Sequence, residues 1–220
     1  MFLWDAIRVG NSRMKDLVVL VACSQIDHSM RGILARHLSL QIRPILFDIF
    51  VHDHKDPGCL HKSDEFLRAQ SSRYAKSLVV FDYDGCGGQP RSAEDLERDV
   101  EANLAANGWG DRGGAVIISP ELEAWVWSDS AAVDEVCGWS GRNPPLRTWI
   151  QNKGFAVDNF CKPIQPKEAL QEALKEVRQQ RSSALFRKLA DRVSLDRCVD
   201  RAFGKLKRLL QGWFPPTRYS

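Results

Sequence analysis

The sequence predicts an α/β fold, with a four-stranded, mainly parallel sheet flanked by helices and a helical appendage at the C-terminal end. Three observations predict it. Apolar runs of strand length alternate with segments of helical spacing as far as residue 130. Beyond that point the alternation stops, and the last third of the chain is helical in pattern. Hydrophobic residues make up 44% of the chain and charged residues 27%, which is typical of a globular protein with a sizeable core.

Four apolar runs predict the strands. They cover residues 17–23, 45–51, 78–81 and 115–118. A continuous apolar run, rather than an alternating one, is typical of a strand that is covered on both faces. The runs are separated by helical segments, so we expect parallel strands joined by right-handed crossovers.

The helices between the strands are expected at 29–40, at 63–74 with Ser63 as its cap, and at 92–108. Ser92 precedes Glu94 and Asp95, which favour the start of a helix, and Gly108 favours its end. Later helices are expected at 121–127, 167–180, 183–193 and 196–213. The predicted organisation is an α/β domain at 15–130, a connector at 131–166 and a basic helical appendage at 167–213.

The net charge of +3 is unevenly distributed. Residues 167–208 hold twelve Lys and Arg against six Asp and Glu, so this segment carries the positive charge. Such a segment favours either a polyanionic partner or an ordinary solvated helix surface. The candidate nucleic-acid-binding residues are Arg187, Lys188, Arg192, Lys205, Lys207 and Arg208.

The six cysteines form no CxxC pair, which argues against a zinc ribbon and for reduced thiols in a cytoplasmic protein. No apolar run has the length of a membrane span, and the first residues lack the pattern of a signal peptide. Membrane partners are therefore not expected.

Carboxylates follow two of the predicted strands. Asp82 and Asp84 come directly after the run at 78–81, and Glu121 and Glu123 come just after the run at 115–118. If these strands are neighbours, the four side chains meet at one edge of the sheet, where open parallel sheets bind ligands. Clustered carboxylates repel one another unless a proton or cation lies between them, and Mg²⁺ or Mn²⁺ suits such oxygen ligands. We expect all four to bind metal, with Asp82, Asp84 and Glu123 as the catalytic residues.

At this point residues 15–130 resemble the Toprim domain of topoisomerases, primases and overcoming-lysogenization-defect-type nucleases. The order of strands and helices, the DxD of Asp82 and Asp84, and the acidic pair after the next strand carry the resemblance. It implies Mg²⁺ binding by the DxD acids and a glutamate after the first strand that assists acid–base chemistry. Here Ala22 or Cys23 stands where that glutamate belongs, and thiolate is a poor ligand for a hard cation.

A shorter resemblance concerns the segment PELEAW at 120–125 with Lys162, Pro163, Pro166 and Lys167. It is similar to Toprim-like proteins of prokaryotic defence islands, including methylation-associated defence systems. This resemblance implies a Mg²⁺-dependent nuclease, or a nuclease-derived subunit, that acts in anti-phage defence with other subunits as partners. DNA and RNA both remain open as substrates.

Three alternatives stay open. The run LVVFDYDG at 78–85 resembles the first motif of the haloacid dehalogenase superfamily, which would make Asp82 a nucleophile and Asp84 a general acid or base, supported by Ser119 and Lys162. The segment HDHKD at 52–56 partly resembles a metallo-β-lactamase motif, with Cys59 and His61 as further zinc ligands. The third alternative is a non-catalytic subunit that binds nucleic acid or a protein partner through its basic helices.

Overall fold

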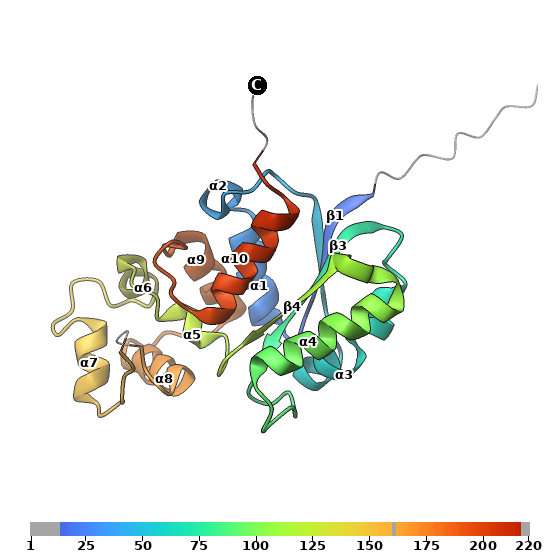
Figure 1. The fold of residues 1–220 in the computed structure, drawn as a ribbon. Helices are drawn as coiled ribbons and strands as arrows, with labels where there is room; N and C mark the ends of the chain where they lie inside the picture. The colour runs from blue at the N-terminus through green and yellow to red at the C-terminus, as the bar shows by residue number, and fades with distance from the viewer. Residues whose placement is uncertain (1–13, 160–161, 217–220) are drawn as a thin grey trace, which may run out of the picture.

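The sheet is all-parallel and has the strand order β2-β1-β3-β4 in the computed structural model, which describes residues 14–159 and 162–216 (Figure 1). Within these residues its four strands are β1 (Lys15–Val21), β2 (Phe47–Val51), β3 (Tyr74–Asp82) and β4 (Gly113–Ile118). Each predicted strand is confirmed within a few residues at its ends. In β1 the run from Leu17 to Val21 is fully buried, as a continuous apolar strand in a covered sheet should be.

The strand order fixes where the helices lie. The chain moves from β1 to β2 in one direction and from β2 through β3 to β4 in the other. Right-handed crossovers therefore place α1 (Ser24–Leu34) on one face, and α3 (Lys55–Arg68) and α4 (Ala93–Leu104) on the opposite face. α3 packs against β1 and β3, and α4 packs against β4.

The remaining helical segments follow the same chain order. They are α2 (His37–Leu40), η1 (Ala105–Trp109), η2 (Gly110–Arg112), α5 (Glu123–Val126), α6 (Ala131–Val136), α7 (Leu146–Asn152), α8 (Pro166–Glu176), α9 (Ser183–Arg192) and α10 (Arg201–Trp213). Among the described helices, none combines the length and the apolar character that crossing a membrane requires.

The C-terminal helices complete the cover of the sheet. α1 alone would leave β3 and β4 bare on its face, and α10 fills this place by packing on β4, while α9 packs on α1. The contact of α10 with the strand is close, because a Cβ added at Gly114 would lie 2.8 Å from the ring of Trp213. The helices that the sequence suggests as an appendage thus pack directly on the α/β core.

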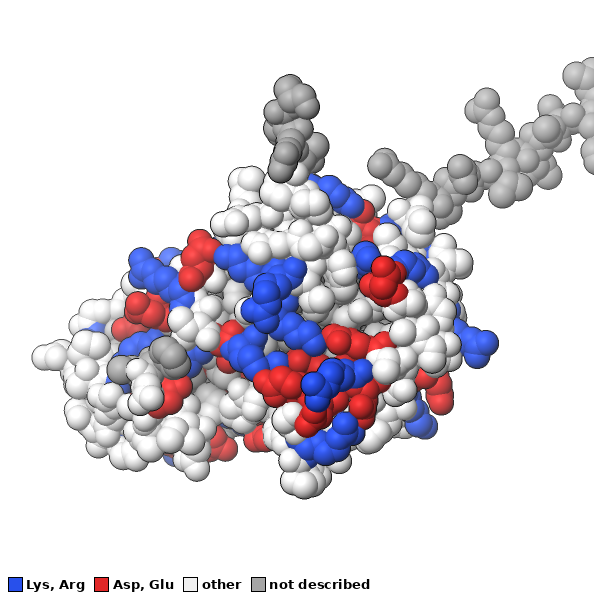
Figure 2. Space-filling model, viewed as in Figure 1, with Lys and Arg blue, Asp and Glu red and all other residues white. Residues whose placement is uncertain are grey.

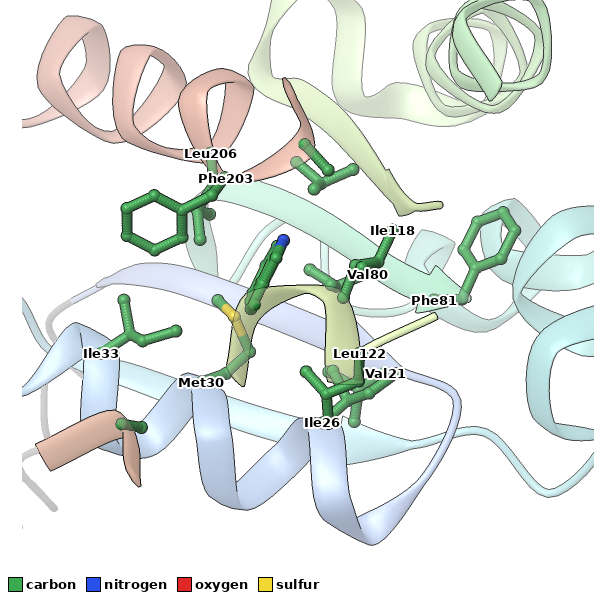
Figure 3. Close-up of a cluster of buried hydrophobic side chains, with 14 of the residues drawn as sticks. Val21, Ile26, Met30, Ile33, Val80, Phe81, Ile118, Leu122, Phe203 and Leu206 are labelled. Carbon is green, nitrogen blue, oxygen red and sulfur yellow. The ribbon is translucent and has the colours of Figure 1, made fainter. Parts of the chain in front are cut away.

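One apolar cluster joins these layers (Figure 3). Met30 of α1, Val80 of β3 and Leu122 after β4 meet Phe203 and Leu206 of α10 between the sheet and its helices. All five are at most 3% exposed. At ~25 cal/mol per Å² of apolar surface, each such side chain contributes about 1.5–3 kcal/mol to folding.

Several helix boundaries differ from the sequence-based expectation. The start at Ser63 was wrong: α3 begins at Lys55, and Ser63 is buried inside it. The segment expected at 29–40 is two helices, α1 and α2, which are separated at Ala35 and Arg36. The predicted connector contains α6 and α7. In contrast, the cap at Ser92 is confirmed, since its hydroxyl accepts a hydrogen bond from the backbone N–H of Asp95 at 3.1 Å.

Candidate functional site

The candidate site lies at the carboxyl edge of the two central strands and β4. β1 and β3 are neighbours although the chain visits β2 between them, so the crossovers leave β1 in opposite directions at this edge. Open α/β sheets bind their ligands at such a reversal of strand order. β3 also pairs with β4, with Asp82 opposite Ile118, so the acids after these two strands meet as the sequence suggests.

Asp82 is the centre of this group. It is the last residue of β3, and its carboxyl group accepts a hydrogen bond from the backbone N–H of Leu122. Its Oδ1 has no hydrogen-bond partner in the described part of the chain. Burial raises the pKa of Asp82 well above its usual range, and the negative charges of Asp56, Glu123 and Glu121 raise it further. This carboxyl group therefore favours its protonated form or a bound cation.

Asp56 is the acid of this group that the sequence reasoning missed. It lies in the first turn of α3, and its Oδ1 accepts the backbone N–H of Asp82 at 2.9 Å. Burial raises the pKa of Asp56, while this hydrogen bond opposes the rise. Asp56 thus connects the start of α3 to the end of β3 and adds a second partly buried carboxylate.

Glu121 and Glu123 reach the same edge, and each is paired with a cation from the C-terminal part of the chain. Lys167 Nζ lies 2.7 Å from Glu121 Oε2, and Arg181 Nε lies 2.7 Å from Glu123 Oε1. The Glu123 side chain is 1% exposed, so Arg181 supplies the charge that makes its burial tolerable. Burial raises the pKa of Glu121, against the effect of Lys167, and the hydrogen bond to Glu121 raises the pKa of Lys167.

Asp84 lies in a different environment from Asp82. β3 ends at Asp82, so the alternation that would place both side chains on one face ends there as well. The backbone N–H of Asp84 donates to the carbonyl of Pro120 at 2.9 Å, and its side chain is exposed. Asp84 is therefore at the rim of the group, whereas Asp82 is at its buried centre.

Cys23 lies just after β1, where the resemblance expects a glutamate. Burial raises the pKa of the Cys23 thiol, and the charges of Asp82 and Asp56 raise it further. The residue therefore does lie near the carboxylates, but as a neutral thiol. The nearby Asp27 belongs to α1, where it pairs with Arg31 at 2.8 Å.

The donor types fit a hard divalent cation, but their arrangement is closed. Carboxylate oxygens are the ligands that Mg²⁺ prefers, and the unpartnered Oδ1 of Asp82 offers one of them. Over residues 14–159 and 162–216, however, no group of three His, Cys, Asp or Glu side chains is arranged to hold a metal ion. Lys167 and Arg181 stand where a cation would supply the balancing charge.

Comparison of this chain with protein-family models, with curated proteins and with solved structures finds no match. The residues of the site are therefore the evidence that bears on function.

The haloacid dehalogenase alternative needs an ionised Asp82 as nucleophile, and the raised pKa of this residue works against it. Lys162, the lysine of that alternative, is buried and donates to the carbonyl of Ala124 at 3.2 Å. In the zinc alternative, His52 Nδ1 accepts the backbone N–H of His54 at 3.0 Å and Gly58 packs against its ring. Both histidines therefore shape the loop before α3.

Most of the candidate nucleic-acid-binding cations are paired with acids. The pairs are Arg187 with Asp191, Arg192 with Glu135, Lys205 with Glu97 and Glu101, and Lys207 with Asp196. Lys188 and Arg208 are exposed and form no ion pair with other described residues. The basic excess of the C-terminal segment is thus largely balanced by local carboxylates, and Arg208 on α10 is one of its free charges.

Proposed function

We propose that this protein is a Toprim-like, Mg²⁺-dependent nuclease or nuclease-derived subunit of a prokaryotic anti-phage system, acting in the cytoplasm. The supporting observation is the group of Asp56, Asp82, Glu121 and Glu123 at the carboxyl edge of the sheet, with a buried, unpartnered oxygen at Asp82. The link to nucleases and to defence comes from the resemblance of the DxD and PELEAW segments.

In this proposal Asp82, Glu121 and Glu123 hold the divalent cation, and Asp84 joins them from the rim. When bound, Mg²⁺ lowers the pKa of a water nucleophile and stabilises the charge on the phosphate oxygens. Asp82 is protonated without a cation and gives up this proton as the cation binds. Lys167 and Arg181, once released from the glutamates, are positioned to bind the phosphate of the substrate.

The test combines binding with cleavage. Isothermal titration calorimetry measures Mg²⁺ and Mn²⁺ binding to the full chain, and incubation with plasmid and with single-stranded DNA or RNA measures cleavage. Asp82→Asn keeps the shape of the side chain and removes its charge, so we expect it to abolish both metal binding and cleavage. Asp129→Asn is the matched control, because Asp129 is an exposed acid just after α5.

Cleavage that survives in Asp82→Asn would overturn the proposed site. Absence of metal binding in the wild type would overturn the nuclease and leave a nuclease-derived binding subunit. Turnover of p-nitrophenyl phosphate that is lost in Asp82→Asn would instead favour the phosphatase alternative.

A further inference from the structure

A groove with a volume of about 590 Å³ runs between α4 and α10. Arg98, Arg201, Lys205, Arg208 and Trp213 line it. Figure 2 shows this face, with a band of basic side chains running down α10 beside the acidic side chains of α4. The groove is thus bordered by both signs of charge, and their pairing decides what it attracts.

The wall nearest the sheet is neutralised and fixed. Glu97, which is 2% exposed, accepts hydrogen bonds from Arg201 at 2.9 and 3.0 Å and from Lys205 at 3.1 Å. It also accepts the backbone N–H of Ile117 at 2.9 Å. These contacts anchor α10 on β4 and hold the Arg201 and Lys205 side chains in place.

The other end of the groove carries charge that is not fully neutralised. Arg208 is exposed and makes no ion pair within the described chain. The ring of Trp213 is half-buried, and Lys76 Nζ lies 5.7 Å from its centroid. Across the groove the Arg98 side chain pairs with Asp95 on its own helix but remains 73% exposed. Accessible cations therefore surround an aromatic ring on a rigid helix.

We propose that this groove binds a single strand of nucleic acid. Exposed cations that follow a groove bind the phosphates of a strand, and an aromatic ring stacks on one of its bases. Arg208 and Arg98 are the phosphate contacts, and Trp213 is the stacking residue. The volume falls within the ~300–1,000 Å³ of a small-molecule pocket, which admits a nucleotide or a short stretch of single strand rather than a double helix.

The groove is continuous with the carboxylate edge. Arg201, at the first position of α10, donates to the carbonyl of Ile117 near the end of β4 at 2.9 Å. Asp200, just before it, accepts the indole N–H of Trp125 in α5, the helix that begins at Glu123. A strand in the groove is thereby directed to the candidate site, and this part of the inference rests on the proposed function.

Gly212 offers a substitution that tests the groove without disturbing the core. It lines the groove, and a Cβ added there meets nothing within 4 Å. Gly212→Glu places a negative charge in the groove, and Gly212→Gln is its uncharged control of similar shape. Both replace glycine by a better helix former. Arg208→Gln removes the free cation, and Lys62→Gln, in α3 on the opposite face of the sheet from α10, is its control.

The measurement is fluorescence anisotropy of a labelled single-stranded oligonucleotide with the full chain, without divalent cation, over a series of salt concentrations. We expect Gly212→Glu to weaken binding by about tenfold or more and Gly212→Gln to change it by about twofold or less. Arg208→Gln should reduce the slope of log affinity against log salt by about one. Lys62→Gln should leave both affinity and slope unchanged.

Equal affinities of Gly212→Glu and Gly212→Gln, absence of binding at low salt, or stronger binding of an acidic peptide would overturn the inference. Because no metal is present, groove-dependent binding in a protein that cuts nothing would sustain the groove and refute the nuclease. Metal-dependent cleavage that is insensitive to Gly212→Glu would do the reverse.

Discussion

Asp82 should make the stability of the protein fall as pH rises. Burial, followed by the charges of Asp56, Glu123 and Glu121, raises its pKa in the folded state, whereas an unfolded aspartate has a pKa of about 3.9. Above pH ~4 the folded state therefore holds a proton that the unfolded state has lost. The stabilisation is fully present below the unfolded pKa and is lost as pH rises through the folded pKa.

The size of the effect follows from one proton. A difference of one bound proton changes the free energy of unfolding by about 1.4 kcal/mol per pH unit, so Asp82 contributes a loss of at most about 2.7 kcal/mol between pH 5 and pH 7. Asp82→Asn removes this contribution and leaves the shape of the side chain. We expect the variant to gain on the wild type with every unit of pH.

Urea unfolding between pH 4.5 and 8 provides the assay, followed by the fluorescence of the seven tryptophans. Asp129→Asn, at an exposed acid, should follow the wild type at every pH. The reasoning is refuted if wild type and Asp82→Asn have parallel pH profiles, or if the variant loses stability relative to the wild type as pH rises. Added Mg²⁺ should flatten the wild-type profile, because a bound cation replaces the proton.

Three other outcomes are expected. Leu206→Ala opens a cavity under α10 and should lower the free energy of unfolding by about 3 kcal/mol and the melting temperature by about 6–12 °C, measured by scanning calorimetry; an unchanged melting temperature would contradict this packing. Arg181→Leu leaves Glu123 buried without its cation and should cost about 3–5 kcal/mol in urea titrations, whereas the double variant with Glu123→Leu should recover most of it. Lys167→Gln removes the cation that competes for Glu121, so Mg²⁺ should bind more tightly by calorimetry; weaker binding would show that Lys167 assists the metal.

The sheet was predictable because its signal is local. The run at 78–81 is apolar without interruption, and a strand buried on both faces needs nothing else to be recognised. The start of α3 was missed because HDHKD is polar and reads as loop. Asp56 and Pro57 were the available signal, since an acid and a proline both favour the first turn of a helix.

The site was predictable only in part, because half of it is assembled by tertiary contacts. The meeting of Asp82 with Glu121 and Glu123 follows from the pairing of β3 with β4, which the sequence suggests. Asp56 joins them only because β2 lies beyond β1, and no spacing in the sequence encodes that strand order. Arg181, 58 residues from Glu123, has no local signal at all.

The position of these cations late in the chain couples the C-terminal helices to the site. Glu121 and Glu123 follow β4, while Lys167 lies in α8 and Arg181 lies between α8 and α9. A ligand that takes over the glutamates must first displace both cations, so its affinity is lowered by the free energy of those pairs. The coupling is reciprocal: the ligand loosens the segment between α8 and α9 by the same amount as that segment weakens the ligand. The strength of this pairing, rather than the carboxylates alone, therefore sets the cation concentration at which the site becomes active.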